Sequence, residues 1–329
     1  MRAIRRILVA VKNPKAKALP AVAKAAQLAR AFNAELVLFQ AIPVPLYLDA
    51  DVFLLGAGLA DAERTTHESC LEGLQSIARR LRAKQIKVRV SAQWDYPIYE
   101  AIIREARRVK ADLIVAERHE GRHIAAGLMH LTDWELLRLS PMPVLLVKRA
   151  GIYRRPLVLA AVDPDHSWDK PARLDKAILA AGAALAKALR GTLHAVHAYV
   201  AVPLTAFSGG TLSEQDILQM KKRAGTVAAE KLWRLTRSVV TGSRCHLLAR
   251  HPADAIEQVA AQTRSDLVVM GAISRSGLKR LLIGNTAEKV LDRLACDVLV
   301  IKPEGLIKHV PRARRSAPYI RFQPAGVMV

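Results

Sequence analysis

The chain has 329 residues, of which 51% are hydrophobic and only 5% aromatic, and its formal net charge is +22. This length suits two domains of ordinary size, about 150 residues each, and no apolar run reaches the roughly 18 residues that a membrane-spanning helix needs. Three scattered cysteines cannot form a disulfide framework and no signal peptide precedes the first strand, so we expect a cytoplasmic protein without a membrane segment.

The positive charge is spread over both halves, with +9 on residues 1–150 and +13 on the rest. One interpretation is attraction to an acidic partner such as nucleic acid, acidic lipid or a phosphorylated ligand. The other is a solvated basic surface, which we favour because the sequence has no nucleic-acid-reading motif and no stripe of aromatic residues.

The first half alternates buried-strand runs with stretches of helical periodicity. Its predicted strands are 7–11, 35–42, 86–90, 112–116 and 143–147, and its predicted helices cover about 19–29 and 60–84, with further helices beginning at Pro97 and Thr132. A loop rich in proline and glycine, 43–58, is expected after the second strand. Thr132 and Glu135 have the spacing of a capping box, which predicts a helix start there.

The second half repeats this order. Its predicted strands lie near 157–162, 192–198, 244–248, 266–271 and 297–301, and its predicted helices near 170–189, 213–238, 252–263 and 286–295. Residues 110–116 recur at 264–270, and 143–148 at 297–302, with one offset of 154 residues. That period is too long for a solenoid, so the chain holds two copies of one domain.

We therefore expect two tandem Rossmann-like α/β domains, 1–150 and 151–304, each with a five-stranded, parallel, doubly wound sheet. The junction at 149–155 is short, so the halves should pack together. Residues 305–329 form a basic tail that we interpret as an extended arm or a disordered end.

Open α/β sheets bind ligands beyond the carboxyl ends of their strands. In the second half, Asp163 follows the first strand and Gly271 ends the fourth. The segment after Gly271 carries further candidate residues, namely Ser274, Gly277, Gly284, Asn285 and Thr286. The glycines permit close approach of a ligand, and the expected helix start at 284–286 suits an anion such as phosphate. The alternative is plain helix capping, with Asp163 as an ordinary turn residue.

This arrangement resembles the universal stress protein family, whose nucleotide-binding members have a Gly-x2-Gly-x9-Gly-(Ser/Thr) motif here. The resemblance implies a flavodoxin-like fold, a cytoplasmic stress-response role and, in some members, ATP binding. We expect no enzymatic activity. It matches Asp163 to an acid that contacts ATP, Ala198 to a position whose backbone contacts adenine, and Gly271 and Gly284 to the first and third glycines. Ser274 and Asn285 stand where the motif has its second glycine and its Ser/Thr.

The first half lacks this pattern. Lys12 stands in the place of Asp163, Glu117 in that of Gly271, and His130 and Leu131 in those of Gly284 and Asn285. Because a carboxylate at 117 repels phosphate, we expect no nucleotide there. The resemblance implies that 143–147 pairs with 297–301 within the chain, making a pseudo-dimer. A homodimer of whole chains is left open.

His119-Glu120-Gly-Arg-His123 matches the H-E-x-x-H pattern of zinc proteases. The match lies directly after a strand and includes a glycine, which weakens a helix, so we expect no metal site. Two alternatives to a nucleotide-binding stress protein remain: a scaffold that binds apolar ligands or acidic partners, including nucleic acid, and a hydrolase. The hydrolase ranks last because no nucleophile or general base can be assigned.

Overall fold

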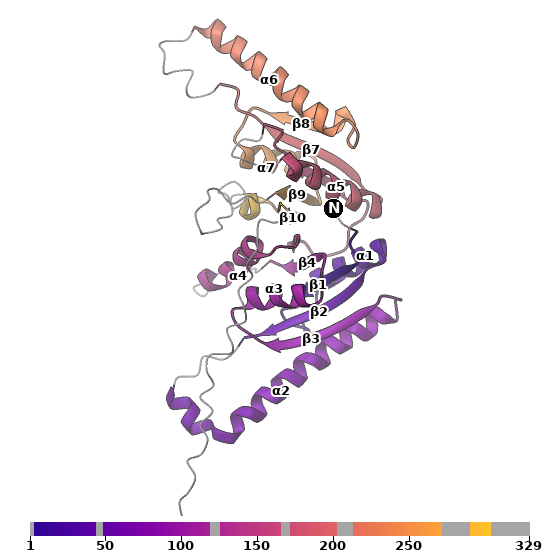
Figure 1. The fold of residues 1–329 in the computed structure, drawn as a ribbon, viewed down its shortest axis with the longest axis vertical. Coiled ribbons are helices and arrows are strands. Elements are labelled where there is room, and N and C mark those ends of the chain that lie inside the picture. The colour runs from indigo at the N-terminus through magenta and orange to yellow at the C-terminus, as the bar shows by residue number, and fades with distance from the viewer. Residues whose placement is uncertain are drawn as a thin grey trace, which may run out of the picture.

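The computed structural model describes residues 3–43, 49–118, 126–165, 172–202, 213–271 and 290–303. In these residues ten strands form one continuous sheet, with helices on both faces (Figure 1). The strand order is β3-β2-β1-β4-β5-β10-β9-β6-β7-β8, so the two halves meet at the middle of the sheet.

The elements of the first half are β1 (Arg6–Ala10), α1 (Pro20–Phe32), β2 (Glu35–Ile42), α2 (Asp49–Arg82), β3 (Val88–Trp94), α3 (Ile98–Arg108), β4 (Leu113–Glu117), α4 (Ala126–Leu139) and β5 (Val144–Val147). Those of the second half are β6 (Leu157–Ala161), α5 (Ala172–Ala188), β7 (Thr192–Ala198), α6 (Glu214–Thr236), β8 (Cys245–Leu248), α7 (Pro252–Gln262), β9 (Leu267–Gly271) and β10 (Asp297–Ile301). Each half has the same parallel strand order, which confirms the predicted doubly wound fold.

The strands are nearly continuous apolar runs because both faces of a parallel sheet are covered by helices. In β1, Ile7 and Val9 face one hydrophobic cluster and Leu8 faces the other, and all three side chains are fully buried. In the central strands β4, β5, β6, β9 and β10 any polar residue likewise stands at a strand end, whereas β3, β7 and β8 have polar residues inside the strand, such as Arg89, His194 and His246. The carboxyl ends of the strands are therefore where a ligand site can be built.

Three predicted features differ from the structure. Thr132 and Glu135 lie inside α4 rather than at its start, because Ala126–His130 continue the helix toward the amino end and a capping box does not interrupt a helix that already runs through it. Gly56 and Gly58 lie inside α2 rather than in a loop; each glycine costs about 1 kcal/mol relative to alanine, which a 34-residue helix absorbs. The third strand is Val88–Trp94 rather than 86–90.

The two halves pair through β5 and β10, as expected. These strands are antiparallel, with Leu146 opposite Val298 and Val144 opposite Val300. Each apolar edge strand is thereby covered by the other, and the described sheet has free edges only at β3 and β8.

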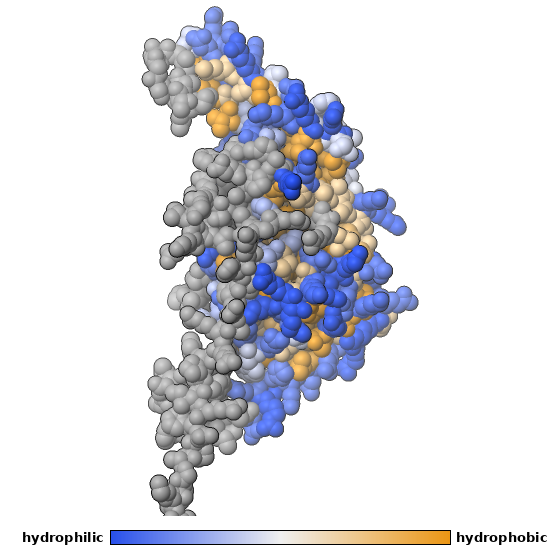
Figure 2. Space-filling view, viewed as in Figure 1, coloured by the Kyte–Doolittle hydropathy of each residue, from blue (hydrophilic) through white to orange (hydrophobic). Residues whose placement is uncertain are grey.

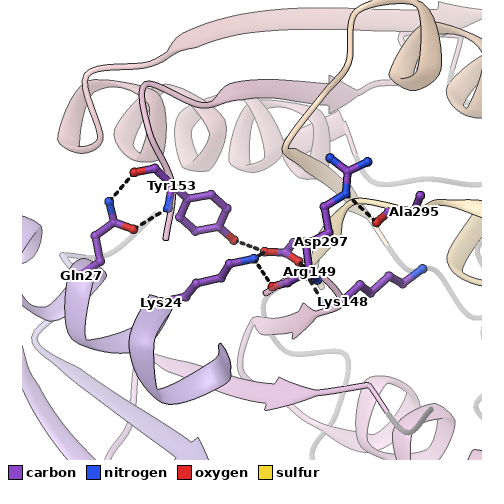
Figure 3. Close-up of polar contacts among 7 residues, drawn as sticks. All are labelled: Lys24, Gln27, Lys148, Arg149, Tyr153, Ala295 and Asp297. Atoms are coloured by element: carbon purple, nitrogen blue, oxygen red, sulfur yellow. Dashed lines mark hydrogen bonds and ion pairs between the residues drawn. The ribbon is translucent and has the colours of Figure 1, made fainter. Parts of the chain in front are cut away.

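A buried carboxylate, that of Asp297, stands at the centre of the contact between the halves (Figure 3). Its Oδ1 accepts hydrogen bonds from the backbone N–H groups of Lys148 and Arg149, at 2.8 and 3.1 Å. Its Oδ2 accepts from the Tyr153 hydroxyl at 2.5 Å and from the ammonium group of Lys24. Asp297 lies on β10 and Lys24 on α1, so this ion pair joins the second half to the first.

The surrounding contacts fix the groups that bind Asp297. Lys24 is only 3% exposed, donates to the carbonyl oxygen of Arg149 at 2.7 Å and lies 4.8 Å from the centre of the Tyr153 ring. Gln27 pairs with the backbone of Tyr153 in both directions, at 2.7 and 2.9 Å. The linker between the halves is thus held against α1.

Two lysines at equivalent positions make reciprocal contacts across the junction. Lys148 follows β5 and donates to the carbonyl oxygens of Leu291 and Leu294, the latter at 2.7 Å. Lys302, which follows β10, donates to the carbonyl oxygen of Arg138 near the end of α4. Each ammonium therefore donates to the carboxyl end of a helix in the other half, α4 for Lys302 and the helix that includes residues 290–293 for Lys148, where the helix dipole favours a positive charge.

Candidate functional site

Three of the residues singled out in the sequence lie at the carboxyl edge of the second half. Because β9, β6 and β7 are neighbours in the sheet, they bring Gly271 at the end of β9, Asp163 after β6 and Ala198 at the end of β7 to one edge. Ala198 is opposite Leu248 of β8. Five further candidates, Ser274, Gly277, Gly284, Asn285 and Thr286, lie outside the described residues.

Asp163 is positioned by the helix that follows it. Its backbone N–H donates to Oδ1 of Asp175 at 3.0 Å, and Asp175 is fully buried in the first turn of α5. The carboxylate of Asp175 thus fixes the backbone at the start of the turn that follows β6. Asp163 itself is half-buried at this edge.

The same turn carries a second acid, Asp165, that joins two other elements. Its Oδ2 lies 3.1 Å from Nε2 of His197 on β7, and its Oδ1 accepts from the ammonium of Lys231 on α6 at 2.7 Å. Burial raises the pKa of Asp165, but the hydrogen bond from Lys231 and the charges of His197 and Lys231 outweigh it, so the pKa lies below its usual value. Asp165 is therefore held as a carboxylate.

Gly271 has a packing reason to be glycine. A Cβ atom added there would lie 2.7 Å from Cδ2 of Leu174 and 3.2 Å from Cδ1 of Ile178, both buried on α5. The close approach of α5 to the end of β9 thus excludes a side chain without help from a ligand. Glycine at 271 by itself is weak evidence for a nucleotide.

The corresponding edge of the first half has different chemistry. Glu117 ends β4 opposite Val147, and the carbonyl oxygen of Lys12, which follows β1, accepts from the amide of Gln40 at 3.2 Å. No counterpart of Asp163 stands after β1, where the residues are Val11 and Lys12. The side chains of His130 and Leu131 and the whole of His119–His123 lie outside what the structure describes.

Sequence reasoning missed His197, Asp165 and Lys231 as neighbours of Asp163. Two signals were present: Asp165 follows Asp163 by two residues, and a histidine stands one position before the end of a strand whose other residues are mostly apolar. Lys231 could not be found this way, because α6 lies far along the chain and only the fold brings it to the turn after β6.

The described helices include none that is long and apolar enough to cross a bilayer.

Comparison with known proteins places these features in a family. The model of the Universal stress protein family matches residues 3–148 and again 158–302. The chain is 26% identical over 267 residues to the universal stress protein E homolog of Haemophilus influenzae, covering 76% of this chain and 82% of that protein. It is 28% identical over 225 residues to universal stress protein E of Escherichia coli, covering 67% and 69% of the two chains.

Solved structures share the architecture along almost the whole chain. A protein of unknown function from Pseudomonas aeruginosa PAO1 is similar with a TM-score of 0.68 and 26% identity, covering 94% of this chain and 96% of that one. A universal stress protein from Archaeoglobus fulgidus has a TM-score of 0.60 at 16% identity, covering 90% and 96%, which shows a common fold. Both alignments span the two halves together.

Proposed function

Since this chain belongs to the universal stress protein family, we propose that it is a non-enzymatic stress-response protein of the cytoplasm whose second half binds a nucleotide, such as ATP, or another anionic ligand. The first half then serves as the structural partner that covers β10. The role in stress response follows from the family and its E-type relatives.

One observation carries the binding proposal: the carboxyl edges of the two halves differ where the rest of the fold is the same. In the second half, Asp163, Ala198 and Gly271 meet on neighbouring strands, with the backbone of Asp163 fixed by Asp175. Carboxylates at such an edge can accept hydrogen bonds from the hydroxyl or amino groups of a nucleoside. The corresponding edge of the first half has Glu117 and Lys12 instead.

Calorimetric titration of the full chain with ATP and Mg²⁺ tests the proposal. We expect one site per chain, and Asp163→Asn should weaken binding at least tenfold because one hydrogen-bond acceptor is lost, equivalent to about 1.4 kcal/mol. Lys12→Gln is the matched control in the first half and should leave the affinity unchanged. No heat at millimolar ATP, or equal losses from the two variants, would contradict a nucleotide site in the second half.

A second candidate is a scaffold that binds acidic partners through the basic surface. The net charge of +22 favours it, and hydrophilic side chains cover much of the coloured part of the face shown in Figure 2, with hydrophobic patches between them. Lys221, Lys222 and Arg223 are exposed on that helix. Binding to RNA or DNA should then weaken steeply between 50 and 200 mM salt, as counterion release requires. No binding at low salt excludes this candidate.

A further inference from the structure

Three side chains at the edge of the second half form a group with the composition of a metal site. Asp163 and Asp165 come from the turn after β6, and His197 comes from β7. One oxygen of each carboxylate and one ring nitrogen of His197 all lie within 4.8 Å of one another. In a closed metal site with bonds of about 2.0–2.2 Å, neighbouring ligand atoms are about 3–4 Å apart, so small side-chain rotations would close the group around an ion.

The group is held in place by contacts outside itself. The backbone of Asp163 donates to the buried carboxylate of Asp175, and the ring of His197 is 1% exposed within the sheet. The hydrogen bond between Nε2 of His197 and Asp165, at 3.1 Å, orients the ring. Nε2 is therefore the ring nitrogen that faces the carboxylate of Asp165.

His197 offers one of its two ring nitrogens to this group. Nε2 is the nitrogen that faces Asp165, so an ion between the three side chains would bind Nε2 in place of its proton. The ring proton then lies on Nδ1, on the opposite side of the ring, which is buried and has no hydrogen-bond partner among the described residues.

We propose that Asp163, Asp165 and His197 bind a divalent transition-metal ion. A set of one imidazole and two carboxylates favours ions such as Zn²⁺ or Mn²⁺ over Mg²⁺ and Ca²⁺, which prefer oxygen ligands alone. Lys231 is 46% exposed at its side chain and its ammonium occupies one oxygen of Asp165, so the ion competes with it. The site shares Asp163 with the proposed nucleotide site, but it needs no nucleotide.

The test is equilibrium dialysis of the full chain against Zn²⁺ or Mn²⁺ alone, with metal counted by mass spectrometry. A background variant carrying His119→Ala and His123→Ala removes the other histidine pattern in the chain. On this background we expect one ion per chain, a loss of at least tenfold in affinity with Asp165→Asn and with His197→Gln, and tighter binding with Lys231→Met, which frees an oxygen of Asp165. Circular dichroism shows whether each variant is folded.

Two matched controls make the result specific. Asp254→Asn removes an exposed carboxylate from the same half, and His194→Ala removes a half-exposed histidine whose Nδ1 lies 3.0 Å from Nε2 of His246. Both should leave binding unchanged. Absence of binding at millimolar metal, binding that survives Asp165→Asn, or binding lost with His194→Ala would overturn the proposal. Because no nucleotide is present, none of these outcomes decides whether ATP binds.

Discussion

The two halves share the anchors of their fold and differ at their edges. In each, an aspartate before the fourth strand accepts from the backbone at the start of the first: Asp112 from Arg6 and Asp266 from Leu157, both at 2.9 Å. The residues Lys110 and Arg264 both have positive φ, at 54° and 52°. At the carboxyl edges, by contrast, the positions of Asp163 and Gly271 in the second half are taken by Lys12 and Glu117 in the first. The contacts that stabilise the sheet are thus the same in both halves, and the residues at the carboxyl edge are not.

The contact between the halves shows the same mixture of symmetry and difference. Lys148 and Lys302 act reciprocally, one on each side. Asp297, however, has Pro143 at the equivalent position in the first half, so its set of hydrogen bonds occurs once. Substitutions at these residues distinguish the shared contacts from the unique one.

Asp297→Ala should have the largest effect on stability. It leaves the ammonium of Lys24 buried without its carboxylate, and two backbone N–H groups without their acceptor. Breaking a buried ion pair from one side costs about 3–5 kcal/mol. Urea unfolding followed by circular dichroism measures the loss. The exposed control Asp254→Ala should change stability by less than about 0.5 kcal/mol.

The double variant Lys24→Met with Asp297→Leu should be more stable than Asp297→Ala, because it leaves no unpaired charge buried. A loss below about 1 kcal/mol in Asp297→Ala would show that the unique contact contributes little, and that the shared strand pairing alone holds the halves together.

The reciprocal lysines should make stability depend on pH. Burial, with the nearby charge of Arg118, lowers the pKa of Lys148 to about 8; burial, with the charge of Arg138, lowers that of Lys302 to about 7. Between pH 7 and 8.5 the unfolded chain keeps protons that the folded chain loses, so the free energy of unfolding should rise with pH. Each lysine contributes at most about 1.4 kcal/mol per pH unit.

Lys148→Met and Lys302→Met should each flatten this rise, whereas the exposed Lys222→Met should leave it unchanged. Urea unfolding at pH 7.0, 7.75 and 8.5 gives the slopes. If only one of the two variants alters the slope, the contacts are reciprocal in geometry but not in energy.

Glycine stands at position 271 in the second half, where the first half has Glu117. The variant Gly271→Ala tests whether packing against α5 explains this glycine. The new methyl group would lie 2.7 Å from Cδ2 of Leu174, and overpacking of this kind costs about 1–3 kcal/mol. Gly242→Ala is the control, because nothing lies within 4 Å of the added atom. Equal urea midpoints for the two variants would refute the packing explanation.

Tyr153→Phe should have a smaller effect than Asp297→Ala. It removes one hydrogen bond to a buried carboxylate, worth about 1.5–3 kcal/mol, and keeps the ring beside Lys24. We expect a loss at the low end of that range in urea unfolding at pH 7. A loss as large as that of Asp297→Ala would mean that the hydroxyl group is essential to the whole set of contacts around Asp297.

The sequence allowed most of the fold to be predicted, for a physical reason. Strands buried on both faces are apolar runs such as Ile7–Val9, and repetition at a fixed offset shows which runs correspond. Helix starts were harder, as Thr132 in the middle of α4 shows, because a local capping pattern does not decide against a longer helix.

The buried polar contacts were harder still to predict. Lys24 and Asp297 are 273 positions apart, and Lys231 reaches Asp165 from a helix 66 positions away. In the sequence, Lys24 is simply a lysine among alanines, and nothing marks it as buried. At the carboxyl edge of the second half, Asp163 could be singled out from its place after a strand, whereas its neighbours depended on which strands lie side by side.

The antiparallel pairing of β5 with β10 joins two surfaces of the same molecule. The pairing is therefore intramolecular, and the short linker sets the effective concentration of one half around the other. Dilution of the protein does not separate the two halves. Each half is always paired with the other half of its own chain, in a ratio of one to one. Under that arrangement each half keeps its partner even where their carboxyl edges differ, as at Lys12 and Asp163.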